Sequence, residues 1–308
     1  MARRAFIEKR FGAAALHTIE QANRILREYA AKGYTMTLRQ LHYQFVARAV
    51  PDIEGNAYTN TQQSYKRLGN VMSEGRLAGR VDWDHMEDRL RELERSPRWD
   101  SPSEIISAVA SQYQQDLWEG HDVRPEVWIE KDALAGVIEP VCSELRVDYF
   151  ACRGYVSQSA QFNAAQRFRR YRAKGQEPIV FHLGDHDPSG LDMTRENEAK
   201  FQLLTGQRVK VVRLALNFDQ VEQYNPPANF AKMSDSRAPD YVARFGGESW
   251  ELDALDPDVL ANLIRDAIEP LQDADLWALN KDAEDERIRE VETLANQDWE
   301  SVVEFCNR

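Results

Sequence analysis

Short apolar segments alternate with longer helical segments across the middle of the chain, and this order constrains the fold more than any other feature. The apolar segments cover residues 126–130, 147–152, 179–183 and 209–216, and the helical patterns between them cover 133–145, 159–174 and 191–204. Strands that alternate with helices form a mainly parallel sheet with helices on both faces. The sequence therefore predicts a doubly wound α/β domain. It contains neither a G-x-G-x-x-G motif nor a P-loop, so no nucleotide cofactor is expected.

Acidic residues follow two of these predicted strands. Glu130 ends the first strand, and Asp185 and Asp187 follow the third, in the segment Gly184-Asp185-His186-Asp187-Pro188-Ser189-Gly190. The carboxyl ends of parallel strands lie at one edge of a sheet, where α/β proteins place their ligands. Three carboxylates there favour Mg²⁺, with Mn²⁺ as an alternative, over zinc. An Asp-x-Asp pair alone is also common in surface turns, so the prediction depends on Glu130. We expect His186 to be a solvated loop histidine, because a hard cation prefers oxygen ligands.

The first 80 residues are predicted to form three helices. The first has apolar residues at helical spacing and a stop at Gly33; these residues are Leu16, Ile19, Ala22, Ile25, Leu26 and Tyr29. The second starts after Thr37 as its N-cap and runs to Val46, and the third covers about residues 60–77. Residues 79–83 are predicted to begin a short extended wing. This arrangement suits a helix-turn-helix or winged-helix module.

Arg39 and Tyr43 lie one turn apart on the second predicted helix, away from its core stripe of Leu38, Leu41 and Phe45. A tyrosine in a helix is most often a buried core residue. The position off the stripe and the arginine partner favour a functional role instead. A guanidinium one turn away could hold a phosphate and stabilise the charge that develops when a phenolic oxygen attacks it. We therefore name Tyr43 as a candidate nucleophile and Arg39 as its partner.

The charge of the chain is unevenly distributed, although the formal net charge is −12. Residues 1–80 contain 13 Lys/Arg and 6 Asp/Glu, a balance of +7, and residues 81–308 contain the remaining 26 and 45, a balance of −19. A local basic face can bind nucleic-acid phosphates on an acidic protein, because distant exposed charges are screened. Candidate DNA contacts on the third helix are Lys66, Arg67 and Arg76, with an ordinary solvated basic surface as the alternative.

Composition indicates a globular protein large enough for two domains, with 308 residues, 43% of them hydrophobic and 29% charged. No apolar segment reaches the roughly 20 residues of a membrane helix, and the start of the chain lacks a signal-peptide pattern. We therefore expect no membrane partner and a cytoplasmic location. Cys142, Cys152 and Cys306 are scattered and predict neither a disulfide framework nor a zinc site.

Two further segments complete the expected organisation. Residues 81–122 are predicted to be a helical connection with a helix over 105–118, and Gly120-His121-Asp122 before Pro125 marks a domain boundary. The last segment, 269–308, is acidic and has helical spacing at Leu276, Leu279, Ile288, Val291 and Leu294. We interpret it as a solvated helix packed on its own domain, with a dimer-supporting or partner-binding helix as the alternative. The expected domains are 1–122, 123–268 and 269–308.

Several segments resemble a known family. Trp128-Ile129-Glu130-Lys131-Asp132-Ala133 and Gly184–Gly190 resemble the Toprim fold of topoisomerases, bacterial primases and some nucleases. Arg39-Gln40-Leu41-His42-Tyr43 precedes them, as in the A subunit of topoisomerase VI and the related meiotic double-strand-break protein, where a winged-helix domain carries a catalytic Tyr in an Arg-x-x-x-Tyr helix. Arg153-Gly154-Tyr155 and Glu251-Leu252-Asp253-Ala254-Leu255 also resemble family segments, so the resemblance covers most of the chain.

This resemblance implies a phosphotyrosyl transesterification on duplex DNA. Tyr43 would attack a phosphodiester and become attached to a 5′ end, and Arg39 would position the phosphate. Glu130, Asp185 and Asp187 would hold Mg²⁺, and Lys131 would contact the DNA backbone. In the family the Tyr of one subunit works with the acids of the other, which implies a homodimer that makes one cut per strand.

The departures from the family narrow this expectation. The chain has no ATP-binding motif and nothing resembling the B subunit, so it is not expected to drive strand passage with ATP by itself. It is similar to the stand-alone proteins called Mini-A, found in bacteria, their phages and mobile elements. An unidentified ATPase or other subunit stays open as a partner, and we expect the protein to associate with the nucleoid. Two alternatives stay open: a non-catalytic binder of bent, crossed or end-containing DNA, and a Toprim hydrolytic nuclease that uses metal-activated water.

Overall fold

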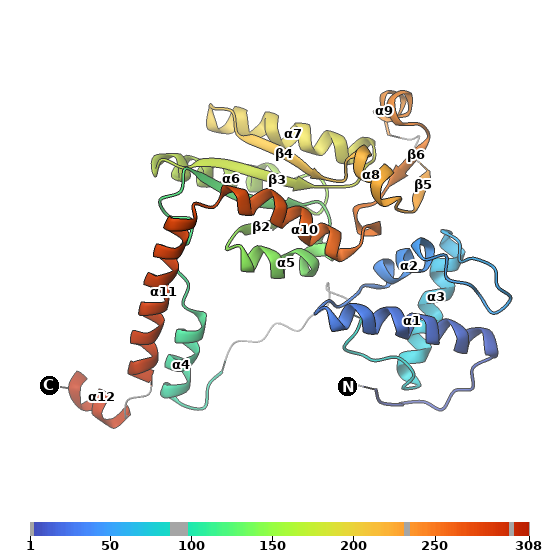
Figure 1. The fold of residues 1–308 in the computed structure, drawn as a ribbon, viewed down its shortest axis with the longest axis horizontal. Coiled ribbons are helices and arrows are strands. Elements are labelled where there is room, and N and C mark those ends of the chain that lie inside the picture. Colours follow the sequence, from blue (N-terminus) through green and yellow to red (C-terminus); the bar gives the residue numbers. More distant parts are fainter. Residues whose placement is uncertain (1–2, 87–97, 231–234, 296–298, 308) are drawn as a thin grey trace.

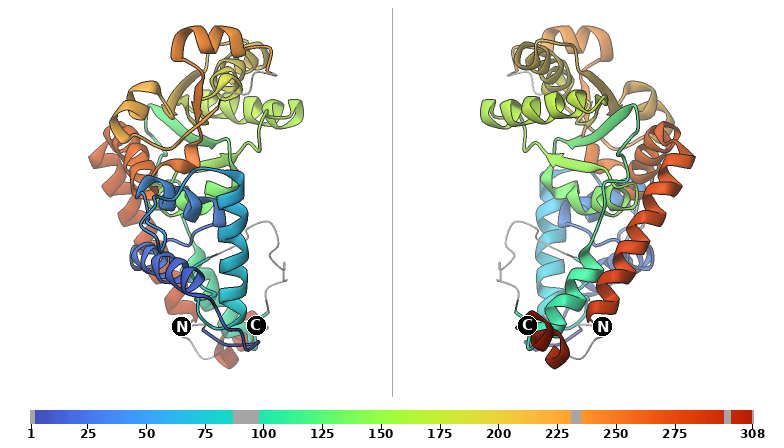
Figure 2. Two further views of the ribbon diagram at one scale, coloured as in Figure 1. Left: turned by 90° about the vertical axis from the view of Figure 1, so that its right-hand side faces the viewer. Right: turned by 90° about the vertical axis from the view of Figure 1, so that its left-hand side faces the viewer.

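The structure is a computed structural model that describes residues 3–86, 98–230, 235–295 and 299–307. The chain forms a helical unit near its N-terminus, an α/β domain built on a parallel sheet, and a helical arm (Figure 1). The helical unit and the arm lie at opposite ends of the α/β domain and extend to the same side of the sheet (Figures 1 and 2). The expectation of a mixed α/β fold with a parallel sheet is therefore confirmed.

The helical unit consists of α1 (Ala13–Ala31), α2 (Leu38–Ala47) and α3 (Gln62–Leu77), as the sequence predicts. Thr37 begins α2 with a capping box, because its side chain accepts from the Gln40 amide while the Gln40 side chain accepts from the Thr37 amide. The three helices share one core, whose buried residues include Ile19, Ala22, Ile25, Leu26, Tyr29, Leu41, Phe45, Leu68 and Met72. Leu16 is an exception to the predicted stripe, since it is exposed in the first turn of α1.

Residues 79–83 do not form the extended segment that was predicted to begin a wing. Gly79 has φ 69°, a left-handed conformation that turns the backbone, and residues 79–83 form bends and a turn rather than a strand. Two isolated bridges flank this segment, between Ala78 and Ala5 and between Met86 and Met36. The loop is held by a side chain instead of a strand partner, because the Arg76 guanidinium donates to the carbonyl oxygens of Trp83 and Met86.

The sheet of the α/β domain has four parallel strands in the order β2-β1-β3-β4. The strands are β1 (Val123–Ile129), β2 (Asp148–Ala151), β3 (Glu177–Leu183) and β4 (Lys210–Ala215). All four coincide with predicted segments to within a few residues, and β1 begins directly after the expected boundary at Asp122. The strands are rich in β-branched and apolar residues and both faces are covered, which is the pattern of a buried parallel sheet.

Helices cover both faces of the sheet. The helices α5 (Ala135–Glu144), preceded by the short η2 (Asp132–Leu134), and α10 (Pro257–Ile268) cover one face, and α6 (Gln158–Ala173) and α7 (Pro188–Thr205) cover the other (Figure 1). Alternate residues of each strand enter different cores. Val127 and Ile129 of β1 join the cluster beneath α5 and α10, and Trp128 joins the cluster beneath α6 and α7.

A segment that the sequence did not predict as regular structure, residues 217–255, folds over the carboxyl ends of the strands. Its elements are α8 (Phe218–Tyr224), β5 (Ala228–Phe230), α9 (Ala238–Phe245), β6 (Glu248–Trp250) and η3 (Leu252–Ala254). The strands β5 and β6 form a separate antiparallel pair. This segment faces the helical unit (Figure 1), and α2 contacts η3.

The arm is a pair of helices, α4 (Pro102–Gln112) and α11 (Ala274–Ala295), followed by α12 (Trp299–Cys306). The α4 helix ends earlier than predicted, because Trp118 turns into the core of the α/β domain and donates to the Leu145 carbonyl at 3.0 Å. The α11 helix packs along α4 rather than on a face of the sheet, so the expected packing on its own domain is only partly right. Leu279 is exposed, and the side chain of Leu294 lies outside the described residues.

The α11 helix joins the α/β domain through a buried carboxylate. Glu284 accepts hydrogen bonds from the Gln115 amide at 2.7 Å and from Arg146 at 2.8 Å. The remaining short helix, η4 (Glu269–Leu271), connects α10 to α11. Within the described residues no helix is long and apolar enough to cross a membrane. The three cysteines are free thiols, as expected.

Candidate functional site

The ends of β1 and β3 bring three acidic side chains to one edge of the sheet. The two strands are adjacent and pair Ile129 with Leu183, so Glu130 and Gly184 leave the sheet side by side. The Glu130 amide donates to the Leu183 carbonyl at 2.8 Å, and Glu130 Oε2 accepts from the Asp185 amide at 2.9 Å. Glu130 therefore braces the loop that carries Asp185, as the convergence of strand ends predicts.

Asp187 begins α7 as its N-cap. Its Oδ1 atom accepts from the Ser189 hydroxyl at 2.9 Å and from the Gly190 amide at 2.6 Å. Pro188 is the first helical residue, so these residues start a helix as expected. Gly190 comes so close to the loop that a Cβ atom there would lie 2.1 Å from the Asp185 carbonyl oxygen. The helix therefore fixes the positions of both aspartates.

A partly buried arginine that the sequence reasoning missed supports this loop. Arg213 of β4 donates to the carbonyl oxygens of Gly184 at 3.0 Å, Asp185 at 2.6 Å and Gly190 at 2.9 Å. Burial lowers the pKa of Arg213 to about 10, although the nearby acids, Glu130 first, oppose this change. The sequence signal for it was a basic residue in the middle of the apolar run 211–216.

His186 is buried, against the expectation of a solvated loop histidine. The reason is the segment 217–255, which covers the loop and surrounds the imidazole with four aromatic rings, those of Phe218, Tyr241, Phe245 and Trp250. Its Nδ1 atom lies 2.8 Å from the Tyr241 hydroxyl. Burial lowers the pKa of His186 to about 4. The histidine anchors the segment to the loop and is not directed to solvent.

Each of the three acids uses one oxygen to hold the fold. Glu130 uses Oε2, Asp185 uses Oδ1 to accept from the Leu252 amide at 2.7 Å, and Asp187 uses Oδ1. Their second oxygens form no hydrogen bond or ion pair with a described residue. Three available carboxylate oxygens are the donor chemistry of a hard cation. Within the described ranges, no group of three or more His, Cys, Asp or Glu side chains lies close enough together to hold a metal ion. The three acids would therefore have to move closer to one another to bind one.

Lys131 fills the space beside these acids. Its ammonium lies 3.0 Å from Asp185 Oδ1, 2.9 Å from Glu251 Oε2 and 2.8 Å from Asp253 Oδ1. Burial alone lowers the pKa of Lys131, but the three carboxylates outweigh it and raise the pKa above its usual value. Burial raises the pKa of Asp185 to about 7, even though Lys131 opposes the shift. The sequence indicated a DNA-backbone contact for Lys131, and the structure places it inside a carboxylate cluster.

Arg39 and Tyr43 face the same edge from the helical unit. Tyr43 is 4% exposed but does not belong to the core of that unit. It lines a pocket of about 350 Å³ together with residues of both parts of the chain, which include Arg39, Asp185, Asp187, Asn229 and Glu251. Burial raises the pKa of Tyr43, the charges of Asp253 and Glu251 add to the rise, and Asn229 and Arg39 oppose it. The pocket thus unites the candidate nucleophile with two of the three acids.

The helical unit meets the α/β domain through polar side chains. The contacts between the two parts include Tyr29 Oη to Asp256 at 2.5 Å, Lys32 to Asp258, and Arg39 Nη1 to Glu251 Oε2 at 2.6 Å. Asn60 Nδ2 also donates to Asn229 Oδ1 at 2.9 Å and to the Ala228 carbonyl at 3.0 Å. No cluster of buried hydrophobic residues within the described residues includes members of both parts. Each part therefore has its own core, and the contact between them depends on charge and hydrogen bonding.

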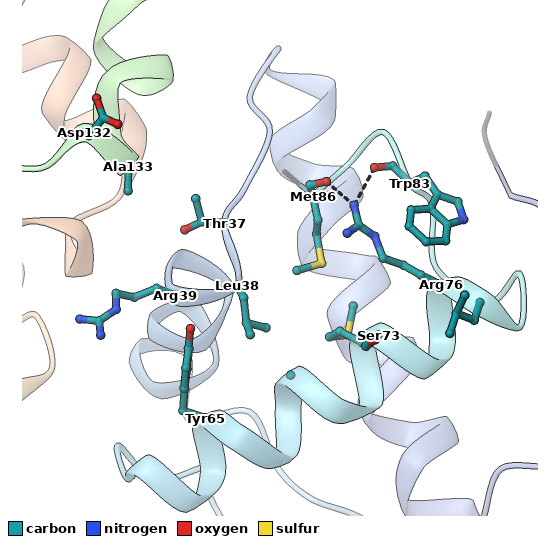
Figure 3. Close-up of a pocket in the computed structure, with 13 residues that line it drawn as sticks. Thr37, Leu38, Arg39, Tyr65, Ser73, Arg76, Trp83, Met86, Asp132 and Ala133 are labelled. Atoms are coloured by element: carbon teal, nitrogen blue, oxygen red, sulfur yellow. Dashed lines mark hydrogen bonds between the residues drawn. The ribbon is translucent and has the colours of Figure 1, made fainter. Parts of the chain in front are cut away.

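A wider groove lies on the other side of Arg39 (Figure 3). It has a volume of about 600 Å³ and runs between α2, α3 and η2, with Asp132 and Ala133 on its far wall. Arg76 lies at one end, bound to the carbonyls of Trp83 and Met86, and Arg39 extends from α2 away from it (Figure 3). Lys66 and Arg67 are exposed on α3. Of the three candidate DNA contacts on α3, these two are the more accessible.

Neither a comparison with models of known protein families nor a search of curated proteins found a match for this chain.

Proposed function

We propose that this protein binds duplex DNA and cleaves it by phosphotyrosyl transesterification, in the manner of the topoisomerase VI A subunit that its motifs resemble. In this proposal the helical unit is a winged-helix domain, and the α/β domain is a Toprim domain. The observation that carries the proposal is the pocket in which Tyr43 and Arg39 of α2 lie with Asp185 and Asp187 at the strand ends. No other part of the chain supplies this combination of motifs.

The residues of the pocket divide the reaction between them. Arg39 binds a nonbridging oxygen of the phosphate, since a guanidinium matches the geometry of a phosphate group. The oxygen of Tyr43 attacks phosphorus, a Tyr–phosphorus bond forms at the 5′ end, and the bond to the 3′ oxygen breaks. The phenolic proton leaves Tyr43, and the 3′ oxygen gains a proton. Mg²⁺ held by Glu130, Asp185 and Asp187 would offset the charge on the phosphate oxygens and on the leaving group.

A covalent adduct tests this proposal directly. The protein is incubated with end-labelled duplex DNA and Mg²⁺ and trapped with denaturant, and a protein–DNA adduct is expected from the wild type and not from Tyr43→Phe. Tyr65→Phe is the matched control, because Tyr65 lines the same pocket from α3. An adduct that survives in Tyr43→Phe and disappears in Tyr65→Phe would reassign the nucleophile.

A second candidate function, non-catalytic binding of bent, crossed or end-containing DNA, is favoured by one observation. Tyr43 is buried with a raised pKa, and Arg39 is already paired with Glu251, so neither is ready to act. This candidate predicts salt-dependent DNA binding with no adduct from the wild type. A third outcome would instead indicate a hydrolytic nuclease: the wild type cleaves DNA without forming an adduct, Asp185→Asn does not cleave, and Tyr43→Phe still cleaves.

A further inference from the structure

Two cations from different parts of the chain meet at a single oxygen atom. Arg39 Nη1 of the helical unit lies 2.6 Å from Glu251 Oε2, and Lys131 Nζ of the α/β domain lies 2.9 Å from the same atom. The other oxygen, Oε1, accepts from the Asn229 amide group at 3.3 Å. A guanidinium, an ammonium and an amide around one oxyanion are the donors that bind a phosphate group.

Glu251 differs from its acidic neighbours in how it is held. Asp185 is fixed by the Leu252 amide, and the side chain of Asp253 is only 2% exposed. Within the described residues, the Glu251 carboxylate accepts hydrogen bonds only from other side chains, and the Glu251 side chain is 27% exposed. Glu251 also lines the pocket that contains Tyr43. A rotation of its side chain is therefore enough to free Arg39 in that pocket and to remove one of the three carboxylates that surround Lys131.

We propose that the Glu251 carboxylate occupies the position of a DNA phosphate in the free protein, and that a backbone phosphate entering the Tyr43 pocket displaces it from Arg39 and Lys131. The inference rests on the proposed DNA function for the identity of the ligand, and on the contacts above for the site. With Glu251 in place, two cations face the three carboxylates Asp185, Glu251 and Asp253, so an incoming anion meets a net negative cluster. Displacement of Glu251 leaves a site that can accept the phosphate.

The displacement also breaks a link between the two parts of the chain. The Arg39–Glu251 pair is one of the few polar contacts by which the helical unit holds the α/β domain. A phosphate that takes the place of Glu251 exchanges this internal ion pair for a contact with the ligand. Glu251 therefore restrains both phosphate binding and the movement of the helical unit until DNA arrives.

The test compares Glu251→Gln with Glu248→Gln. Both substitutions remove one negative charge near β6, but Glu248 is exposed and forms no ion pair in the described part of the chain. Without divalent cations and at constant ionic strength, inorganic phosphate should raise the melting temperature of Glu251→Gln more than that of the wild type or Glu248→Gln. A labelled duplex should bind Glu251→Gln about tenfold more tightly than either, because an internal competitor for the phosphate is gone. Equal responses of the two variants would overturn the inference.

A second substitution separates the phosphate site from the general charge of the cluster. Arg39→Gln in the Glu251→Gln background should cancel the gain in phosphate stabilisation, because the guanidinium is then missing. A gain that persists in this double variant, or weaker phosphate binding by Glu251→Gln, would refute the proposed site. If the Glu251 variant does not fold, Arg39→Gln alone is compared with the wild type for stabilisation by phosphate. This substitution changes a half-exposed side chain.

The outcomes distinguish this inference from the proposed function. An adduct at Tyr43 together with unchanged phosphate and DNA binding by Glu251→Gln would refute the inference and leave the function standing. Phosphate stabilisation of Glu251→Gln without any DNA binding would support the anion site and refute DNA as its ligand.

Discussion

At Gly190 the backbone of α7 comes too close to the acidic loop for any side chain. A Cβ atom there would meet the Asp185 carbonyl oxygen at 2.1 Å and the Asp185 carbonyl carbon at 3.0 Å. Arg213 holds both backbones in place, because it donates to the Gly190 carbonyl of the helix and to the Asp185 carbonyl of the loop. Because neither the helix nor the loop can yield without breaking these bonds, glycine is required for the positions of Asp185 and Asp187.

We expect Gly190→Ala to lower the free energy of unfolding by at least about 2 kcal/mol, the range of backbone strain and overpacking in a core. Urea denaturation followed by circular dichroism measures this change. Gly247→Ala is the matched control, because a Cβ atom at Gly247 would meet nothing within 4 Å, and it should change stability by no more than about 0.5 kcal/mol. Equal effects of the two substitutions would show that the close approach is absent in solution.

The contact between β3 and α7 contains a histidine that the fold keeps neutral. His182 is fully buried, and its Nδ1 atom lies 2.8 Å from the Thr194 hydroxyl of α7. Arg213 also donates to this hydroxyl at 2.9 Å, so the hydroxyl proton is free to point to His182. Burial, with the nearby charge of Arg213, lowers the pKa of His182 from 6.5 to about 3.

This histidine makes stability depend on pH with a defined sign. Between pH 6.5 and about pH 3 the unfolded chain protonates His182 and the folded chain does not, so stability is lost as the pH falls through this range. His182→Phe should reduce the slope of unfolding free energy against pH by up to about 1.4 kcal/mol per pH unit. A slope that is the same in His182→Phe and the wild type would contradict the buried neutral state.

Local sequence signals were sufficient for most elements and for part of the site. Thr37 and Gln40 form a capping box whose residues and spacing are visible in the sequence, so the start of α2 and the direction of Arg39 follow from local rules. Glu130 and Asp185 were predicted to converge because the ends of adjacent parallel strands must meet at one edge.

The remaining parts of the site depend on contacts between residues far apart in the chain. His186 is buried because residues 217–255 fold over it, and no periodic pattern marked that segment. Lys131 lies among carboxylates that follow it by 54 to 122 residues, so its partners could not be read from its neighbours. Tyr43 was expected to lie off the core stripe, and it does, but its burial comes from the α/β domain.

At the scale of the whole molecule, we propose that the contact between the helical unit and the α/β domain is exchanged between two copies of the chain. The contact is polar, and each part keeps a separate hydrophobic core. The same pairs, Arg39 with Glu251 and Asn60 with Asn229, can form between the helical unit of one copy and the α/β domain of another. This exchange agrees with the homodimer that the family resemblance implies, in which Tyr43 of one subunit works with the acids of the other.

Mixing two inactive variants distinguishes the two arrangements. Tyr43→Phe lacks the nucleophile and Asp185→Asn lacks an acid, and we expect neither to form an adduct with duplex DNA alone. If the sites form between subunits, half of the randomly mixed dimers contain one intact site, and the mixture should yield about a quarter of the wild-type adduct. A mixture of Tyr43→Phe with the variant that carries both Tyr43→Phe and Asp185→Asn is the control and should yield none. If the mixture is inactive while the wild type is active, the pocket works within one chain, in the arrangement that the structure shows. The proposed exchange between subunits would then be wrong.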